Sequence, residues 1–157
     1  FLDYDIVAEA SHVWGKVGSV AGDFTAADAA DQLIDLIYTP KAQFRANGRF
    51  VMNRRTVAAV RKLKDVDGRY IWQPGTGGEP ATIMGYPVTE AEDMPDIGTG
   101  NAAIAFGDFR RFYLIADRQG ARVLRDPYSA KPFVLFYTTK RVGGGVQNFD
   151  AAKVMVF

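Results

Sequence analysis

The chain has 157 residues, of which 48% are hydrophobic and 24% charged, so we expect a globular domain with a real core and not a disordered segment. It contains no cysteine, which excludes disulfides, zinc–cysteine sites and thiol catalysis within it. No apolar run approaches the roughly 20 residues that a membrane-spanning helix needs. Because the chain begins at Phe1 and not at Met, we interpret it as a fragment or processed product that lacks an upstream part.

The net charge is only +1, but charges of one sign are grouped along the chain. Residues 1–38 are acidic apart from Lys16, and residues 79–96 carry only acidic charges. Residues 41–69 and 110–153 are mostly basic. Blocks of opposite sign favour self-association, in which one patch meets a complementary patch of another copy. Simple solvation of the surface is the alternative explanation.

Two helices are predicted in the first part of the chain, after a segment (residues 1–22) that is irregular or strand-like. The first begins at Thr25 as N-cap and ends at Pro40. Its apolar face consists of residues at helical spacing: Ala26, Ala29, Ala30, Leu33, Ile34 and Ile37. A strand at residues 48–52 precedes the second helix, Arg54 to about Lys64, which Asn53 caps.

The middle of the chain alternates short strands with turns and loops. We expect a turn at 65–68, a strand at 70–72 and a loop at 73–80, where glycine and proline disfavour regular structure. A strand at 83–88 contains Pro87, which places it at an edge or a bulge. An acidic loop follows, at 89–101.

The stretch 104–118 has the most regular pattern of the chain. Ile104 and Phe106 alternate with small residues, as in a strand that packs one face. The break at 107–108 lets Asp108 cap a short turn. Residues 112–116 are all apolar, which predicts a strand covered on both faces, closed by the charged pair at 117–118.

The last third is predicted to be β-structure. It comprises residues 121–125, a turn at 126–127, and a strong strand at 133–139 that continues through a glycine patch at 140–146. A turn at 148–150 leads to a final strand at 153–157. Two helices followed by many strands predict an α+β fold, a mixed sheet flanked by two main helices.

Three motifs resemble catalytic or ligand-binding sites but are incomplete. The only histidine, His12, has no G-x-S-x-G elbow to pair with. The glycine-rich loop Gly75 to Gly78 lacks G-K-[ST] and is followed by Glu79-Pro80. Asp65-x-Asp67-Gly68 lacks the downstream glutamate of a calcium loop. Ordinary structural roles explain all three better, so we predict no cofactor and no metal site.

Two charged clusters leave alternatives open. Glu90, Glu92 and Asp93 could form a carboxylate pair for a hydrolase, although their loop has no aromatic platform for a sugar. The second helix has a basic face that could meet a phosphate backbone or serve solubility: Arg54, Arg55, Arg61 and Lys62.

Three groups of segments, taken in order, match the pattern of a known family. The first is Phe50-Val51-Met52-Asn53 before a helix ending Leu63-Lys64-Asp65-x-x-Gly68-Arg69-Tyr70, and the second is Gly85-Tyr86-Pro87-Val88 followed by Asp93-Met94-Pro95. The third is Ile104 to Phe109 with Asp117-Arg118, and then Arg125-Asp126-Pro127-Tyr128. With these segments the chain resembles the C-terminal part of a tailed-bacteriophage major capsid protein of the Hong Kong 97-type fold. The first two groups resemble its axial domain, and the third resembles the passage into its peripheral domain.

The resemblance implies three parts: a connecting segment at 1–24 from the missing upstream part, an axial domain at 25–116, and peripheral-domain strands at 117–157. The upstream part would hold the N-terminal arm, the extended loop and the spine helix. The loop 73–80 would point toward the capsomer centre. The expected intersubunit contacts are Gln73, Thr76, Glu79, Arg110 and Arg111.

The resemblance also implies a non-enzymatic shell subunit that forms pentamers and hexamers around packaged DNA. Such a protein belongs to the virion capsid, is assembled in the bacterial host cytoplasm, and has no membrane partner. Scaffold, protease and portal proteins are its possible partners, and its proximity to DNA is non-specific. A prophage or gene-transfer particle is an equivalent setting.

One departure from the family concerns covalent cross-linking. Some members join subunits through a Lys–Asn isopeptide bond assisted by an acidic residue. The Asn and the acid lie near the start and middle of the strand that matches 133–141, where this chain has Lys131-Pro132-Phe133 and Thr138-Thr139. We therefore expect non-covalent assembly or separate cementing proteins. An encapsulin-like nanocompartment, which would hold an enzyme cargo in place of nucleic acid, is the alternative function, and a hydrolase that uses the acidic loop is the second.

Overall fold

The computed structural model describes residues 16–24, 29–64, 70, 72 and 82–157. The chain divides into two compact units, one made of residues 1–112 with 148–157 and the other of residues 113–147. The division predicted at 116/117 therefore falls inside a strand, and the end of the chain returns to the first unit. The two units are described separately below.

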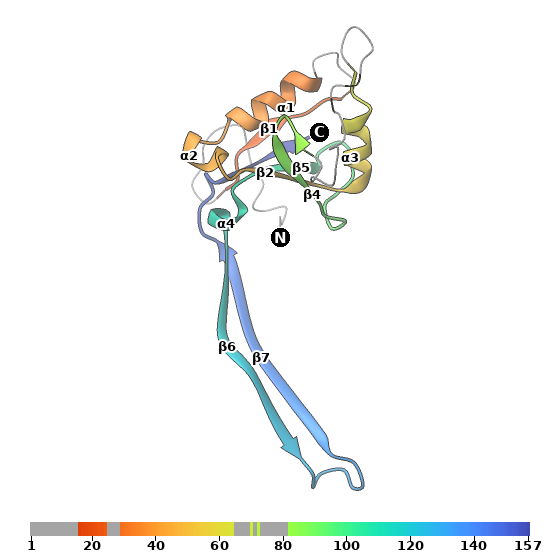
Figure 1. Cartoon of the computed structure of the whole chain (residues 1–157), viewed down its shortest axis with the longest axis vertical. Helices are drawn as coiled ribbons and strands as arrows, with labels where there is room; N and C mark the ends of the chain where they lie inside the picture. Colours follow the sequence, from red (N-terminus) through yellow and green to blue (C-terminus); the bar gives the residue numbers. More distant parts are fainter. Residues whose placement is uncertain (1–15, 25–28, 65–69, 71, 73–81) are drawn as a thin grey trace. The chain divides into compact units, whose positions relative to one another are not determined.

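Within the described part of the first unit, six strands form a mixed sheet in the order β1-β8-β5-β2-β4-β3 (Figure 1). The pairs β1–β8 and β2–β4 are parallel and the other pairs are antiparallel. The strands are β1 (Ser19–Ala21), β2 (Arg49–Met52), β3 (Thr82–Ile83), β4 (Tyr86–Glu90), β5 (Ala102–Gly107) and β8 (Ala152–Val156). The predicted α+β class with a mixed sheet is confirmed.

Four helices lie in the described part of this unit: α1 (Ala29–Tyr38), α2 (Ala42–Arg45), α3 (Arg54–Arg61) and α4 (Phe109–Phe112). The helix α3 begins as predicted, because the Asn53 side chain accepts a hydrogen bond from the Arg55 backbone N–H at 3.0 Å. The buried face of α1 differs by one position from the prediction. Leu36 is fully buried, whereas Ile34 is 39% exposed.

The large apolar side chains of one sheet face and of both main helices form a single core. Phe50 pairs with Phe106, and Met52 with Ile104, across β2 and β5, so these four side chains point to the same side of the sheet. The same cluster includes Leu33, Leu36 and Ile37 of α1, Val57 and Val60 of α3, and Trp72. Residues of both main helices and of the sheet are thus buried in the same cluster, as the prediction of two main helices on a mixed sheet requires.

One predicted strand, at 83–88, is wrong in detail. Residues 83–88 form a hairpin, because Met84 (φ 51°) and Gly85 (φ 84°) turn the chain between β3 and β4. Pro87 pairs with Thr82 of the two-residue edge strand, which suits a residue without a backbone N–H. Of the strand predicted at 70–72, Tyr70 makes an isolated bridge to Lys64, and residue 71 lies outside the described residues. The expected N-cap at Thr25, the turn at 65–68 and the loop at 73–80 lie outside the described residues.

The second unit is an antiparallel ribbon of two long strands, β6 (Tyr113–Asp126) and β7 (Leu135–Val146), shown in cyan and blue in Figure 1. The expectation that residues 112–116 form a strand covered on both faces is wrong for this chain. Phe112 is buried, but Leu114 is 54% and Ile115 70% exposed. The charged pair at 117–118 does not end the strand either, because β6 continues to Asp126 through a bulge next to Asp117.

Candidate functional site

The junction that follows β5 is built around a buried carboxylate. Asp108 is 3% exposed and accepts hydrogen bonds from the backbone N–H groups of Arg110 and Arg111, at 3.1 and 3.3 Å. These bonds satisfy free donors at the start of α4. The predicted cap at this position is confirmed.

The cap directs two arginine side chains outward. Arg110 and Arg111 are both exposed. The Nε atom of Arg111 lies 3.8 Å from an Asp108 oxygen, and its guanidinium lies 6.0 Å from the centre of the Phe44 ring. Arg110 is therefore the less engaged of the two expected contact residues. The other three, Gln73, Thr76 and Glu79, lie outside the described residues.

The basic face of α3 is largely engaged within the chain. Arg55 forms an ion pair with Asp96 at 2.8 Å, and Arg54 lies 3.6 Å from Glu92. The guanidinium of Arg61 stacks over the Trp72 ring, 4.7 Å from its centre. This face therefore holds the 91–101 loop against the helix, which leaves Lys62 as the member of the predicted basic set without such a contact in the described part of the chain.

The acidic loop is fixed by the same contacts. The Asn53 amide donates hydrogen bonds to the backbone carbonyls of Met94 at 3.1 Å and Glu92 at 3.4 Å. Glu90 and Asp93 are exposed. The described residues contain no group of three acidic or histidine side chains that could hold a metal ion. His12, Gly75 to Gly78 and the Asp65–Gly68 motif lie outside the described residues.

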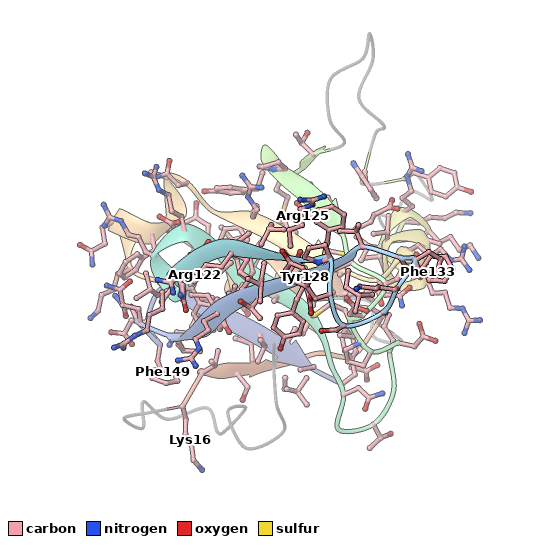
Figure 2. All side chains as sticks on the ribbon, turned by 90° about the horizontal axis from the view of Figure 1, so that it is seen from below. Lys16, Arg122, Arg125, Tyr128, Phe133 and Phe149 are labelled. Atoms are coloured by element: carbon pink, nitrogen blue, oxygen red, sulfur yellow. The ribbon has the colours of Figure 1, made fainter. Side chains whose placement is uncertain are left out.

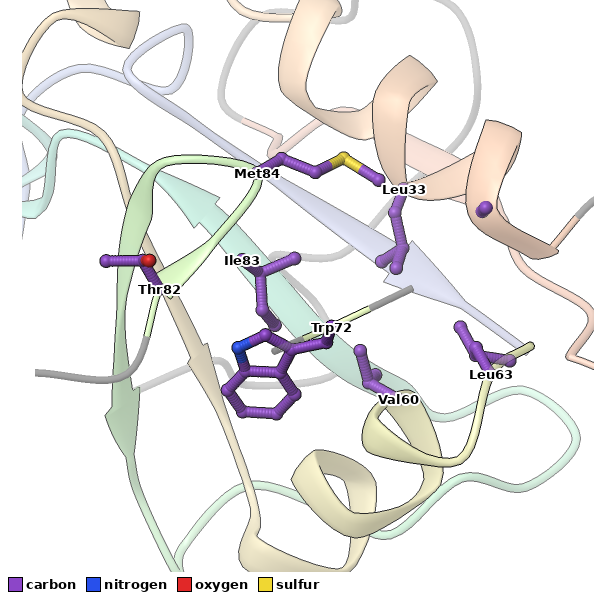
Figure 3. A pocket seen from close by; sticks show the side chains of 8 residues that line it. Leu33, Val60, Leu63, Trp72, Thr82, Ile83 and Met84 are labelled. Carbon is purple, nitrogen blue, oxygen red and sulfur yellow. The ribbon is translucent and has the colours of Figure 1, made fainter. Parts of the chain in front are cut away.

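A small apolar pocket lies between the two main helices and β3 (Figure 3). It measures about 270 Å³ and is lined mainly by Leu33, Val60, Leu63, Trp72 and Ile83. The indole N–H of Trp72 has no hydrogen-bond partner among the residues that the structure describes. Thr82 is the one hydroxyl-bearing residue among the described lining residues, and none of them is charged, so the pocket offers no acid, base or charged group for chemistry. No helix among the described residues is long and apolar enough to cross a membrane.

The ribbon carries an exposed apolar surface that the sequence pattern did not reveal. Large apolar side chains along both strands are exposed, among them Val123, Leu124, Phe136 and Tyr137, each by more than half. Arg122 and Arg125, labelled in Figure 2, lie on the same strand, β6. Exposed large apolar side chains of this kind indicate an interaction surface. The sequence predicts strands in these segments, and predicts cover on both faces for residues 112–116, but it does not predict that their apolar side chains are exposed.

The turn that ends β6 is held by one side chain. Hydrogen bonds from the Ser129 hydroxyl and from the backbone N–H groups of Tyr128 and Ser129 keep the pKa of Asp126 below its ordinary value of 3.8. Asp126 lies at the surface and is only partly covered, so its contribution to stability is small. The predicted turn at 126–127 is confirmed.

Comparison with known proteins gives a consistent result. The family model described as the phage capsid family matches residues 6–157. Two solved structures, the capsids of an empty and of a native GTA particle computed with C5 symmetry, are each 55% identical over 96% of this chain, with TM-scores of 0.81. The match covers 53% and 52% of those chains, so the present chain spans about half their length. No curated protein matches it.

Proposed function

The chain belongs to the phage capsid family, and on that premise we propose that it forms part of a structural subunit of an icosahedral shell around packaged DNA. The observation that carries the proposal is the 55% identity over 96% of this chain to the capsids of GTA particles. A shell subunit needs surfaces for its neighbours and no reactive centre. The exposed arginines at α4 and the exposed ribbon are surfaces of that kind.

We assign the first unit to the axial domain and the ribbon to the peripheral domain. The first unit has a closed core of sheet and helices, as a domain that packs around a symmetry axis requires. The ribbon exposes apolar residues on both faces, and an isolated pair of strands is only marginally stable in water. It therefore needs cover from the remainder of a longer chain or from neighbouring subunits.

The function is tested with the full-length protein. We expect purified full-length protein to form rings of five and six subunits, or closed shells, in electron micrographs. Protein that stays monomeric at high concentration contradicts the proposal. The contents of the shells separate the two compartments: nucleic acid supports a capsid or gene-transfer particle, whereas an enzyme cargo supports the encapsulin-like alternative. We also propose that the shell assembles in the cytoplasm of the bacterial host and that scaffold, protease and portal proteins take part.

Arg110 and Arg111 are proposed as intersubunit contacts, together with Gln73, Thr76 and Glu79. Reversal of the charge in Arg110→Glu is expected to weaken assembly, because a like charge would then face the complementary patch. Arg111→Glu also disturbs the Asp108 cap, so Arg110→Glu is the cleaner variant. Lys62→Glu, on the far end of α3, is the matched control. Equal assembly of both variants contradicts the contact role of Arg110 while leaving the family assignment intact.

A further inference from the structure

One face of the ribbon contains an open groove with a floor of glycines. Leu114 pairs with Gly145, and Ala116 with Gly143, and residues directly opposite in an antiparallel pair lie on the same face. A Cβ atom added at either glycine would meet nothing within 4 Å. The groove measures about 500 Å³. Another backbone or large side chains can therefore approach this part of the ribbon closely.

Two arginines flank the apolar floor. Arg118 and Arg141 line the groove, and neither forms an ion pair in the described part of the chain. The nearby carboxylate, Asp117, is bound instead to Lys140 at 2.8 Å. It lies on the other face of the ribbon, because successive side chains of a strand alternate.

The ribbon as a whole is positively charged, as the groove is. Residues 113–147 contain six basic and two acidic side chains, a net charge of +4, in a chain whose total is +1. The rest of the chain therefore carries −3. A basic ribbon and an acidic first unit in the same protein favour contacts between copies, in which the ribbon of one meets the acidic unit of another.

Helix α1 presents a surface of matching character. Its exposed residues are Asp31, Ile34, Asp35 and Tyr38, which lie at positions i, i+3, i+4 and i+7 and so form one stripe. Ile34 is 39% and Tyr38 67% exposed. Neither aspartate forms an ion pair in the part of the chain that the structure describes. The stripe therefore offers one aliphatic side chain, one aromatic ring, over which the Arg45 guanidinium stacks 4.6 Å from the ring centre, and two carboxylates without an ion-pair partner among the described residues.

We propose that the α1 stripe of one copy docks into the ribbon groove of the next copy. Ile34 and Tyr38 cover the apolar floor, while Asp31 and Asp35 meet Arg118 and Arg141. The contact joins two different surfaces, so repetition from copy to copy produces a ring when the rotation closes. The proposal rests on the shell function above. A polyanion such as DNA would satisfy the arginines but would leave the apolar floor uncovered, which is why a second copy fits better.

Charge exchange in the full-length protein tests the contact. The double variant Arg118→Glu, Arg141→Glu and the double variant Asp31→Lys, Asp35→Lys are each expected to reduce the assembled fraction on the order of tenfold, because like charges then face each other. The protein that carries all four substitutions is expected to regain assembly. Arg125→Glu with Lys131→Glu reverses two charges of the ribbon outside the groove and is the matched control. Circular dichroism and thermal unfolding check that each variant is folded.

The outcomes separate this contact from the shell function. Loss of assembly in both double variants with recovery in the fourfold variant supports the contact. No recovery, or losses equal to those of the control, overturns it even though wild-type shells still form. Groove variants that assemble normally but contain less nucleic acid overturn it in favour of a polyanion site. Wild-type protein that forms no shell refutes the shell function itself.

Cysteine cross-linking gives a second test that does not depend on charge. The chain contains no cysteine, so Asp35→Cys in one copy and Arg141→Cys in another can form a new disulfide between copies. We expect the cross-linked dimer in an oxidised mixture of the two variants assembled together, and not in either variant alone. Arg125→Cys replaces Arg141→Cys in the control mixture. Equal cross-linking of the two mixtures overturns the proposed contact.

Discussion

The strand β5 and the start of β6 have similar sequences and opposite environments. Residues 103–106 of β5 are at most 1% exposed, whereas Leu114 and Ile115 of β6 are 54% and 70% exposed. The strand β5 has hydrogen-bonded neighbours on both sides, β2 and β8, and helices packed over the sheet. Among the described residues, the strand β6 pairs only with β7. Burial therefore depends on how many layers cover a strand, and the apolar run by itself does not decide it.

The two regions also differ in how many of their arginines form ion pairs. Arg54 and Arg55 in the first unit are bound to carboxylates of the 91–101 loop, whereas Arg118 and Arg141 of the ribbon have no such partner in the described residues. The first unit buries its large apolar side chains in its own core, and several of its charged side chains form ion pairs within the unit. The ribbon keeps apolar area and positive charge available, as a surface used between subunits requires.

A phenylalanine-to-alanine substitution is expected to change the free energy of unfolding far more in the first unit than in the ribbon, and this is the largest difference that we predict. Phe106 is fully buried, and its ring centre lies 4.8 Å from that of Phe50 and 5.0 Å from that of Tyr86. We expect Phe106→Ala to lower the free energy of unfolding by about 3–5 kcal/mol, because it leaves a cavity. Phe136 is 65% exposed, and Phe136→Ala should change it by about 0.5 kcal/mol or less.

Urea unfolding of both variants, followed by circular dichroism, measures this difference. A loss for Phe136→Ala as large as that for Phe106→Ala would mean that the ribbon is covered in the isolated chain, and the comparison would fail. In assembled full-length protein the difference between the two losses of stability should be smaller, because neighbouring surfaces then cover the ribbon.

A pair of glycine substitutions gives an intermediate effect. A Cβ atom at Gly107 would lie 2.2 Å from the Ala151 carbonyl oxygen and 2.5 Å from the Ala152 Cα, so Gly107→Ala must displace β8. We expect it to cost about 1–3 kcal/mol. Gly143→Ala meets no atom within 4 Å and should stay within about 0.5 kcal/mol of wild type. Thermal unfolding measures both, and equal melting temperatures would contradict the close packing of β5 on β8.

The smallest expected effect is the pH dependence of the ribbon turn. The pKa of Asp126 in the folded chain lies below 3.8. The stabilisation of the turn is therefore fully present above pH 3.8 and is lost as the pH falls through the lower, folded-state pKa. Amide signals of Tyr128 and Ser129 in NMR spectra should shift in that acidic window and should lose this transition in Asp126→Asn. An unchanged transition in the variant would assign it to another group.

The caps and breaks of the fold could be predicted from single residues. Asn53, Asp108 and Asp126 were each expected to cap or turn the chain, and each accepts the backbone hydrogen bonds that this role requires. The hairpin between β3 and β4 was missed because one of its two turn residues is Met84 with φ 51°, and methionine carries no signal for that conformation. The exchange of Ile34 for Leu36 in the buried face of α1 depends on how the helix is rotated against the sheet.

Part of the candidate site could also be predicted from the sequence, and part could not. The sequence predicted arginines at the junction after β5, and the structure places both on the surface. It did not predict the groove, because the register that sets Leu114 and Ala116 opposite two glycines arises only when β6 and β7 pair.

The sequence by itself determined the α+β class, most element positions and the local caps, because hydrogen bonding within a few residues and side-chain periodicity specify them. Only the tertiary structure decided which apolar strand is buried, which charges are paired and which face of α1 is exposed. These properties depend on residues far apart in the chain, through strand register and the number of layers over each face. The opposite environments of β5 and β6 follow from that physical difference.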